Sequence, residues 1–151
     1  MNAPKWHRTA AIAIALSFAA VAPAIARDTL AEGQFDKTLK VSGAVDLTVM
    51  TGSGSISVRT GDGSTLHVVG HIKVNSGWND GFHMDQKTAD AKVHELETNP
   101  PIEQTGSTIR IGDIRDEDLK RYVSISYEIV TPAETRLHSS TGSGSQEVDG
   151  V

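Results

Sequence analysis

The chain has no cysteine among its 151 residues, which excludes disulfide bonds, thiol catalysis and cysteine-ligated zinc. Aromatic residues make up only 5% and charged residues 22%, and the formal net charge is −5. This composition argues against a nucleic-acid-binding protein, a coiled coil and a polytopic membrane protein. The length predicts one domain with short appendages.

The first 26 residues have the layout of a secretory signal peptide. Met1–Arg8 is basic, Thr9–Ala22 is almost wholly apolar, and Ala24-Ile25-Ala26 matches a small-x-small cleavage site. A membrane anchor is the alternative, but the apolar run is shorter than the roughly 20 residues that span a bilayer. We therefore predict cleavage after Ala26 and export to the periplasm, the cell surface or the exterior. The mature chain, residues 27–151, would have no transmembrane segment.

Residues 27–151 are predicted to form a single β-rich domain, because apolar and polar residues alternate with a period of two. In the clearest run, Val123, Ile125, Tyr127 and Ile129 share one face. Glycine-containing turns separate such runs at intervals of about 8–12 residues, as in all-β proteins. The expected fold is all-β, with stacked strand repeats that form a solenoid-like or rolled sheet. The other alternating runs are 35–41, 45–49, 56–59, 66–74, 109–111 and 135–137.

One segment, residues 84–98, departs from the strand pattern. It lacks glycine, and Ala89, Val93 and Leu96 form one apolar stripe at helical spacing. Asn99-Pro100-Pro101 would end the helix, because a residue that precedes proline is disfavoured in the α region. We predict one short amphipathic helix that lies across the sheet.

A short sequence is repeated: residues 51–55 and 141–145 both read TGSGS, and each is followed by a segment that ends in valine. Such a repeat favours strand–turn units that stack on one another. The second copy lies at the end of the chain, so we expect the array to be incomplete there. We also expect the last residues to be frayed, or to be ordered by self-association through this C-terminal edge strand.

The chain from about Phe35 to Val151 resembles a bacterial adhesin-like family of exported β-strand-repeat proteins of unknown function. The resemblance implies a β-solenoid or rolled-sheet architecture and no known catalytic residues. In the family, the last turn usually begins a longer run of repeats, whereas this chain stops there. The segments that carry the resemblance are Phe35–Gly43, both TGSGS turns, Asn99–Gly106, Ile109–Gly112, Val123–Ile129 and Thr131–Leu137.

The residues that could bind metals or anions are better explained as structural. His67 and His71 share a strand face but lie about 13 Å apart along it, too far to bind one metal without a third element. The acidic cluster 113–118 lacks the pattern of a calcium loop, and nearby basic residues offset its charge. Neither TGSGS turn has the lysine of a phosphate-binding loop or begins a helix. We therefore expect no metal site, although His83 lies near Asp80 and Asp85, and no cofactor.

Trp78 and Phe82, in a loop before the predicted helix, are the candidate ligand-binding residues. Exposed aromatic side chains on a loop often mark a contact surface, although they could instead pack over the sheet. We expect a non-catalytic, exported interaction domain that binds a cell-envelope or extracellular macromolecule. It could also be an envelope sensor or small-ligand-binding module that uses the Trp78–Phe82 loop. No carboxylates at strand-face spacing converge, so no enzymatic activity is expected.

Overall fold

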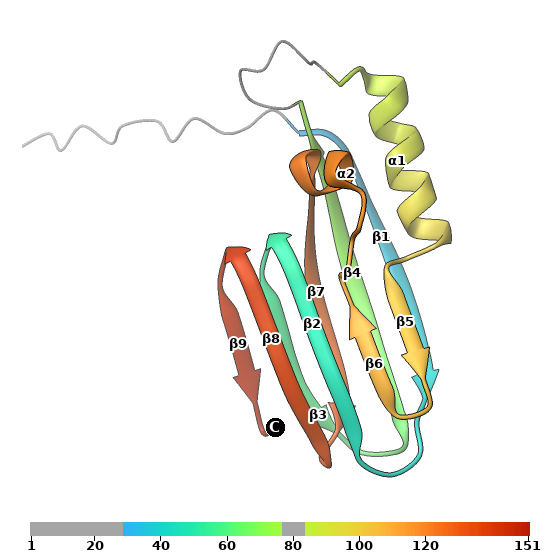
Figure 1. Ribbon diagram of the computed structural model, residues 1–151, viewed down its shortest axis with the longest axis vertical. Coiled ribbons are helices and arrows are strands. Elements are labelled where there is room, and N and C mark those ends of the chain that lie inside the picture. The colour runs from blue at the N-terminus through green and yellow to red at the C-terminus, as the bar shows by residue number, and fades with distance from the viewer. Residues whose placement is uncertain (1–28, 77–83) are drawn as a thin grey trace, which may run out of the picture.

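The computed structural model describes residues 29–76 and 84–151, and it consists mainly of two β-sheets packed face to face (Figure 1). The five-stranded sheet contains, in spatial order, β1 (Thr29–Lys40), β4 (Thr65–Asn75), β7 (Val123–Pro132), β3 (Ile56–Gly61) and β9 (Gln146–Asp149). The four-stranded sheet contains β5 (Ile102–Thr105), β6 (Thr108–Ile111), β2 (Val45–Ser53) and β8 (Thr135–Ser143). The described helices are α1 (Gln86–Thr98) and the six-residue α2 (Glu117–Tyr122).

The predicted all-β class with a short amphipathic helix is confirmed. The alternation in the sequence matches the burial of the strands, because successive side chains of a strand point to opposite faces. In β4, Leu66, Val68, Ile72 and Val74 are buried between the layers, whereas His67 and its odd-numbered neighbours face outwards. The same period places the odd-numbered residues of β7, from Val123 to Ile129, in the core.

Helix α1 covers the upper part of the five-stranded sheet, where it packs on β1 and β4 (Figure 1). Its three predicted core residues, Ala89, Val93 and Leu96, are all buried. The helix begins after Asp85, whose carboxylate accepts hydrogen bonds from the Thr88 hydroxyl and backbone N–H at 2.7 and 3.0 Å. These bonds lower the pKa of Asp85 and satisfy one of the free N–H groups of the first turn. The helix ends at Asn99, as the two prolines predict.

Three strands in each sheet run parallel to one another, and they belong to three strand–connection–strand units. In the four-stranded sheet β2 lies between β6 and β8, and in the five-stranded sheet β3 lies between β7 and β9. The units are therefore β6–β7, β2–β3 and β8–β9, side by side. The other strand pairs, β1–β4, β4–β7 and β5–β6, are antiparallel.

The two TGSGS segments lie at equivalent positions of adjacent units and stack in register. Thr51 pairs with Thr141 and Ser53 with Ser143. Backbone N–H groups of Gly54 and Ile56 donate to the carbonyl oxygens of Ser143 and Ser145, both at 3.0 Å. These bonds continue both sheets across the turn, which we call the corner.

The expected fraying of the last residues differs from the structure, in which Gln146–Asp149 forms β9 and pairs with β3. The corner bonds explain this, because they fix the direction of the chain just before β9. The side chains of β9 nevertheless remain exposed.

Substitutions at adjacent positions of β7 test the packing of the two layers. Ile129 is 1% exposed, so Ile129→Ala should reduce the free energy of unfolding by about 2–5 kcal/mol. Glu128 lies on the outer face and forms an exposed ion pair with His71, so Glu128→Ala should cost less than about 1 kcal/mol. Urea denaturation measures both values, and equal costs would contradict the assigned faces.

Two glycines of the first corner test the stacking. Gly54 has a φ of +146°, and a Cβ there would clash with the carbonyl oxygen of Ile125 in β7, whereas a Cβ at Gly52 would meet no atom within 4 Å. Gly54→Ala should therefore cost at least about 2 kcal/mol, and Gly52→Ala no more than about 0.5 kcal/mol. Thermal unfolding of both variants provides the comparison. If the two glycines tolerated alanine equally, the corner would not be closely stacked on β7.

Candidate functional site

The candidate site is a cavity beside the β6–β7 unit, whose connection between strands is longer than those of the other two units. In the β2–β3 and β8–β9 units, the strands are joined by two residues, Gly54-Ser55 and Gly144-Ser145. The β6–β7 unit instead has residues 112–122 between its strands, and this connection contains α2. The longer connection leaves a cavity of about 380 Å³ between the ends of the two sheets.

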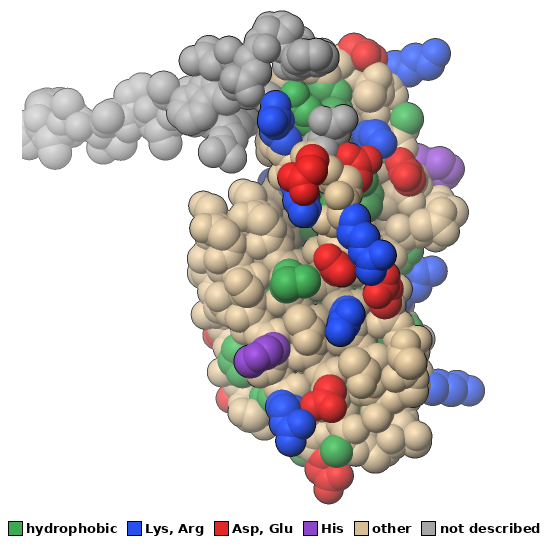
Figure 2. All heavy atoms as spheres, in the orientation of Figure 1, with side chains coloured by type: hydrophobic (Ala, Val, Ile, Leu, Met, Phe, Trp, Pro, Cys, Tyr) green, Lys and Arg blue, Asp and Glu red, His purple; other side chains and the backbone are tan. Residues whose placement is uncertain are grey.

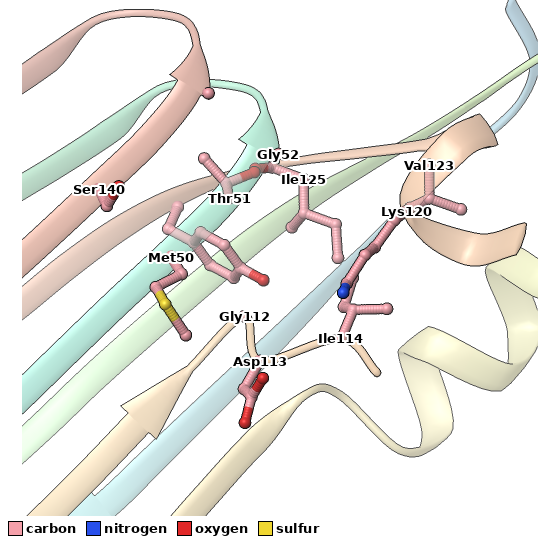
Figure 3. Close-up of a pocket in the computed structure, with 12 residues that line it drawn as sticks. Met50, Thr51, Gly52, Gly112, Asp113, Ile114, Lys120, Val123, Ile125 and Ser140 are labelled. Carbon is pink, nitrogen blue, oxygen red and sulfur yellow. The ribbon is translucent and has the colours of Figure 1, made fainter. Parts of the chain in front are cut away.

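The cavity is lined by residues from three strands, β2, β7 and β8, and from the β6–β7 connection. Figure 3 shows the side chains of Met50, Ile125 and Lys120 converging on one space, with Ile114 and Asp113 at its lower edge. Four of the twelve lining residues have aliphatic side chains: Met50, Ile114, Val123 and Ile125. The complete lining is Met50, Thr51, Gly52, Gly112, Asp113, Ile114, Lys120, Val123, Ile125, Tyr127, Ser140 and Gly142.

Tyr127 contributes the polar group that distinguishes this cavity. Its residue is 1% exposed, and its hydroxyl has no hydrogen-bond partner in the described part of the chain. Burial disfavours the tyrosinate anion and therefore raises the pKa of Tyr127 well above its ordinary value of 10.0. The side chain is held in place by the tilted ring of Phe35, with the ring centroids 6.3 Å apart. At neutral pH the Tyr127 hydroxyl is thus fixed, neutral and unpaired, and it is buried behind the cavity wall.

Gly112 lets the backbone of β2 approach closely beside this hydroxyl. It has a φ of +82°, and a Cβ at this position would clash with the carbonyl oxygen of Met50 and lie 3.1 Å from the Tyr127 hydroxyl oxygen. Glycine is therefore required both by the backbone conformation and by the close approach of β2.

The charged groups of the lining are already paired with neighbours outside it. Lys120 Nζ lies 2.9 Å from Glu117 Oε1, and Asp113 Oδ2 lies 3.7 Å from an Arg115 guanidinium nitrogen. The Thr51 hydroxyl donates to the carbonyl oxygen of Ile125 at 2.8 Å, which ties β2 to β7. No hydroxyl in this described arrangement is thus paired with a base that would make it a nucleophile. The arrangement suits binding.

Among the residues singled out in the sequence, Asp113 borders the cavity, whereas His67 and His71 do not. Trp78, Phe82 and His83 fall outside the described residues, so the structure does not address the ligand-binding prediction for their loop. His67 and His71 lie on the outer face of β4, where they pair with Asp36 at 2.7 Å and Glu128 at 3.2 Å. In residues 29–76 and 84–151, no group of three or more histidine or acidic side chains is placed to hold a metal ion. No helix in these ranges is long and apolar enough to cross a bilayer.

Nothing local in the sequence signals the cavity. The alternation in β7 places Tyr127 in the core, as the structure confirms, but it does not show whether the hydroxyl finds a partner. In the segment 113–118, which the sequence does not mark as helical, Glu117 begins α2 and Asp113 borders the cavity. Only the pairing of the strands shows that β6–β7, β2–β3 and β8–β9 are equivalent units, and that the connection of β6–β7 is longer than the two-residue corners of the others.

Tyr127→Phe tests whether the hydroxyl is unpartnered. Removing a buried hydroxyl that makes no hydrogen bond should leave the free energy of unfolding unchanged or raise it by up to about 1–3 kcal/mol. Urea denaturation at pH 7 measures the difference. A loss of more than about 1 kcal/mol would show that the hydroxyl makes a stabilising hydrogen bond.

The same pair of proteins gives a prediction for alkaline pH. Above a pH of about 10 the unfolded chain releases the Tyr127 proton while the folded chain keeps it. The wild type should therefore lose up to about 1.4 kcal/mol of unfolding free energy per pH unit relative to Tyr127→Phe, with no divergence below about pH 9. Denaturation curves from pH 8 to pH 11 of both proteins check this. Parallel profiles over the whole range would contradict the burial of the hydroxyl.

In comparisons with known proteins, no family, no curated protein and no solved structure matched this chain. The resemblance to the adhesin-like family therefore remains a prediction from the sequence.

Proposed function

We propose that this chain is a non-catalytic, exported interaction domain that self-associates through the open end of its two sheets. The open end consists of the outward edges of β8 and β9. Both strands are last in their sheets, so each has one edge without a strand partner in residues 29–76 and 84–151. Unpaired backbone N–H and C=O groups along such an edge can pair with another strand. This unprotected double edge is the observation that carries the proposal.

The edge of β8 lacks the usual protection against pairing. Proteins commonly block an edge strand with lysine, proline, a bulge or short length. Strand β8 has nine residues and one charged side chain, Arg136, which points to Asp46 of β2 at 3.1 Å. Figure 2 shows charged side chains gathered over α2, β5 and β6, whereas none is seen over the upper parts of β8 and β9. Charge repulsion would therefore oppose pairing only weakly along β8, whereas the four-residue β9 carries two exposed carboxylates, Glu147 and Asp149.

The open end also exposes apolar surface. Among the described residues, the exposed large hydrophobic side chains are Val148 and Val151, at 46% and 41%. Val148 lies beside Val58 in the parallel register of β9 and β3. Val58 is only 1% exposed, because β9 and the opposite sheet cover it. A further strand beside β9 would cover Val148 in the same way.

A second copy of this chain is the occupant that fits the open end. A partner that satisfies both edges must present two strand edges about 10 Å apart, the spacing of packed sheets. The β8–β9 end of a second copy presents such a pair. Twofold symmetry would place β8 against β8 and β9 against β9 in antiparallel fashion, so that each sheet continues into the partner.

Export and the absence of catalysis belong to the same proposal. The signal-like layout of residues 1–26 supports export, although these residues lie outside the described ranges. The chain recovered from the producing cell should begin at Arg27, as N-terminal sequencing would show; an intact Met1 on a cytoplasmic product would contradict export.

The paired charges of the cavity, and its Thr51 hydroxyl, which is bonded to the backbone, support binding over catalysis.

Sedimentation analysis of the purified chain tests the self-association. The wild type should form a dimer with increasing concentration. Val148→Asp, which places a carboxylate at the pairing edge, should weaken the dimer by at least about tenfold, the equivalent of 1.4 kcal/mol. Thr38→Asp is the matched control, because it places the same charge at an exposed site of β1, the opposite edge strand.

Both variants must retain the wild-type circular dichroism spectrum for this comparison. A wild-type chain that stays monomeric up to about 1 mM, the weak limit of specific affinities, would refute self-association. Equal dimerisation of Val148→Asp and the wild type would show that the interface lies elsewhere.

A further inference from the structure

We propose that self-association through the open end is controlled by the protonation of Glu147 and Asp149, whose carboxylates the dimer brings opposite one another. This inference rests on the proposed function and adds its regulation: the carboxylates weaken the dimer at neutral pH and cease to do so when they take up protons. Both residues belong to β9, whose four side chains are all exposed. Three features support it: the face on which the carboxylates lie, the register of the pairing and the neighbouring charges.

Glu147 and Asp149 lie on the outer face of the five-stranded sheet. In the parallel register of β9 and β3, Val148 lies beside Val58, which is 1% exposed and faces the opposite sheet. Successive side chains of a strand point to opposite faces, so the residues on either side of Val148 point outwards. The two carboxylates are therefore held on one face of the β9 edge, two residues apart.

Twofold symmetry restricts how these side chains can meet. If both sheets continue into the partner, the axis runs perpendicular to the sheets, and outward side chains pair only with outward side chains. Two registers are then centred on the residues of β9. One places Val148 opposite the partner's Val148 and, twice, Glu147 opposite the partner's Asp149. The other places Glu147 opposite the partner's Glu147, so carboxylates oppose each other in both registers.

Opposed carboxylates at this spacing repel each other. Directly opposite side chains of an antiparallel pair have Cβ atoms about 4.5–5.5 Å apart, and like charges there destabilise the pairing. Two carboxylates so close together bind a proton more readily than separate ones, because the proton removes the repulsion. The dimer therefore takes up protons as it forms. The contribution of these groups to dimerisation becomes more favourable as the pH falls towards about 4, where carboxyl groups ordinarily titrate.

The neighbouring strands do not cancel this repulsion. Arg59 lies beside Asp149 in the register of β3 and β9, but no ion pair joins the two side chains in the part of the chain that the structure describes. The neighbour of Glu147 is the uncharged Ser57, and beyond it Glu128 of β7 adds a further carboxylate to the same face. Most of the repulsion between the copies would thus remain.

Strand β8 responds to pH in the opposite sense. His138 is exposed on the outer face of the four-stranded sheet, two residues from Arg136, which is paired with Asp46 at 3.1 Å. Antiparallel pairing of β8 with the partner's β8 brings these basic side chains near each other. Protonation of His138 below about pH 6.5 would therefore weaken the dimer. A change of pH alone does not separate the two effects, whereas removing the carboxylates does.

Sedimentation analysis of the purified chain at pH 7.5 and pH 4.0 compares the wild type with Glu147→Gln/Asp149→Asn, which removes both charges and preserves side-chain size. At pH 7.5 the double variant should dimerise at least about fivefold more tightly than the wild type, because two repulsive pairs are lost. At pH 4.0 this advantage should fall to about twofold or less, because the wild-type carboxylates are then largely protonated in the dimer.

Glu32→Gln/Asp36→Asn is the matched control. It removes two exposed carboxylates from β1, the opposite edge strand, so its net charge equals that of the double variant while β9 is unchanged. The control should dimerise as the wild type does at both pH values. Circular dichroism shows whether each chain is folded at pH 4.0, and the comparison at pH 7.5 decides the repulsion independently.

Three results would overturn the proposal. Equal dissociation constants of the wild type and the double variant at pH 7.5 would show that the carboxylates do not oppose each other. An advantage that persisted unchanged at pH 4.0 would show that charge does not cause it. An equal gain by the control would assign the effect to net charge. If the wild type and the double variant both stayed monomeric at either pH, self-association itself would be refuted, so the two proposals fail in different ways.

Discussion

The structure depends on backbone hydrogen bonds that join adjacent strand–corner–strand units in register. At the corner of residues 51–55, one side of the chain bonds to β7, through Tyr127 N–H to Ser55 O at 2.9 Å, and the other side bonds to residues 143–145. The Thr51 and Thr141 hydroxyls reinforce this stack by donating to the backbone of the preceding unit, at 2.8 and 3.0 Å. Because Cβ atoms at Gly54 and Gly144 would clash with that backbone, close stacking requires glycine at both corners.

The same arrangement explains where a functional site can form. Two units close with tight two-residue corners, whereas the β6–β7 unit closes with a connection that contains α2 and borders the cavity. Loops that depart from a regular framework commonly carry function, since the framework fixes their ends without constraining their interior. Here the framework fixes Tyr127 through Phe35 and the strand pairing of β7 with β3 and β4, so its hydroxyl has a defined direction.

The two sides of the parallel units end differently. On one side of the units, β7 pairs with the antiparallel strand β4, and β4 pairs with β1; these two strands complete the core together with α1. On the other side, no strand of the described ranges lies beyond β9 and β8. One side of the stack is therefore closed by packing, and the other ends in exposed backbone and Val148. Pairing at the open end would bury this backbone and apolar surface.

The amino-acid pattern alone determined the strand faces, the helix and the corners. The alternation from Val123 to Ile129 identified the buried side of β7, and the Ala89–Val93–Leu96 stripe identified α1, because periodicity is a local property of the chain. The tertiary structure decided the pairing of strands far apart in the sequence, such as β3 with β9, and the formation of α2. It also decided that the Tyr127 hydroxyl has no partner, since hydrogen-bond satisfaction depends on which segments meet around a buried group.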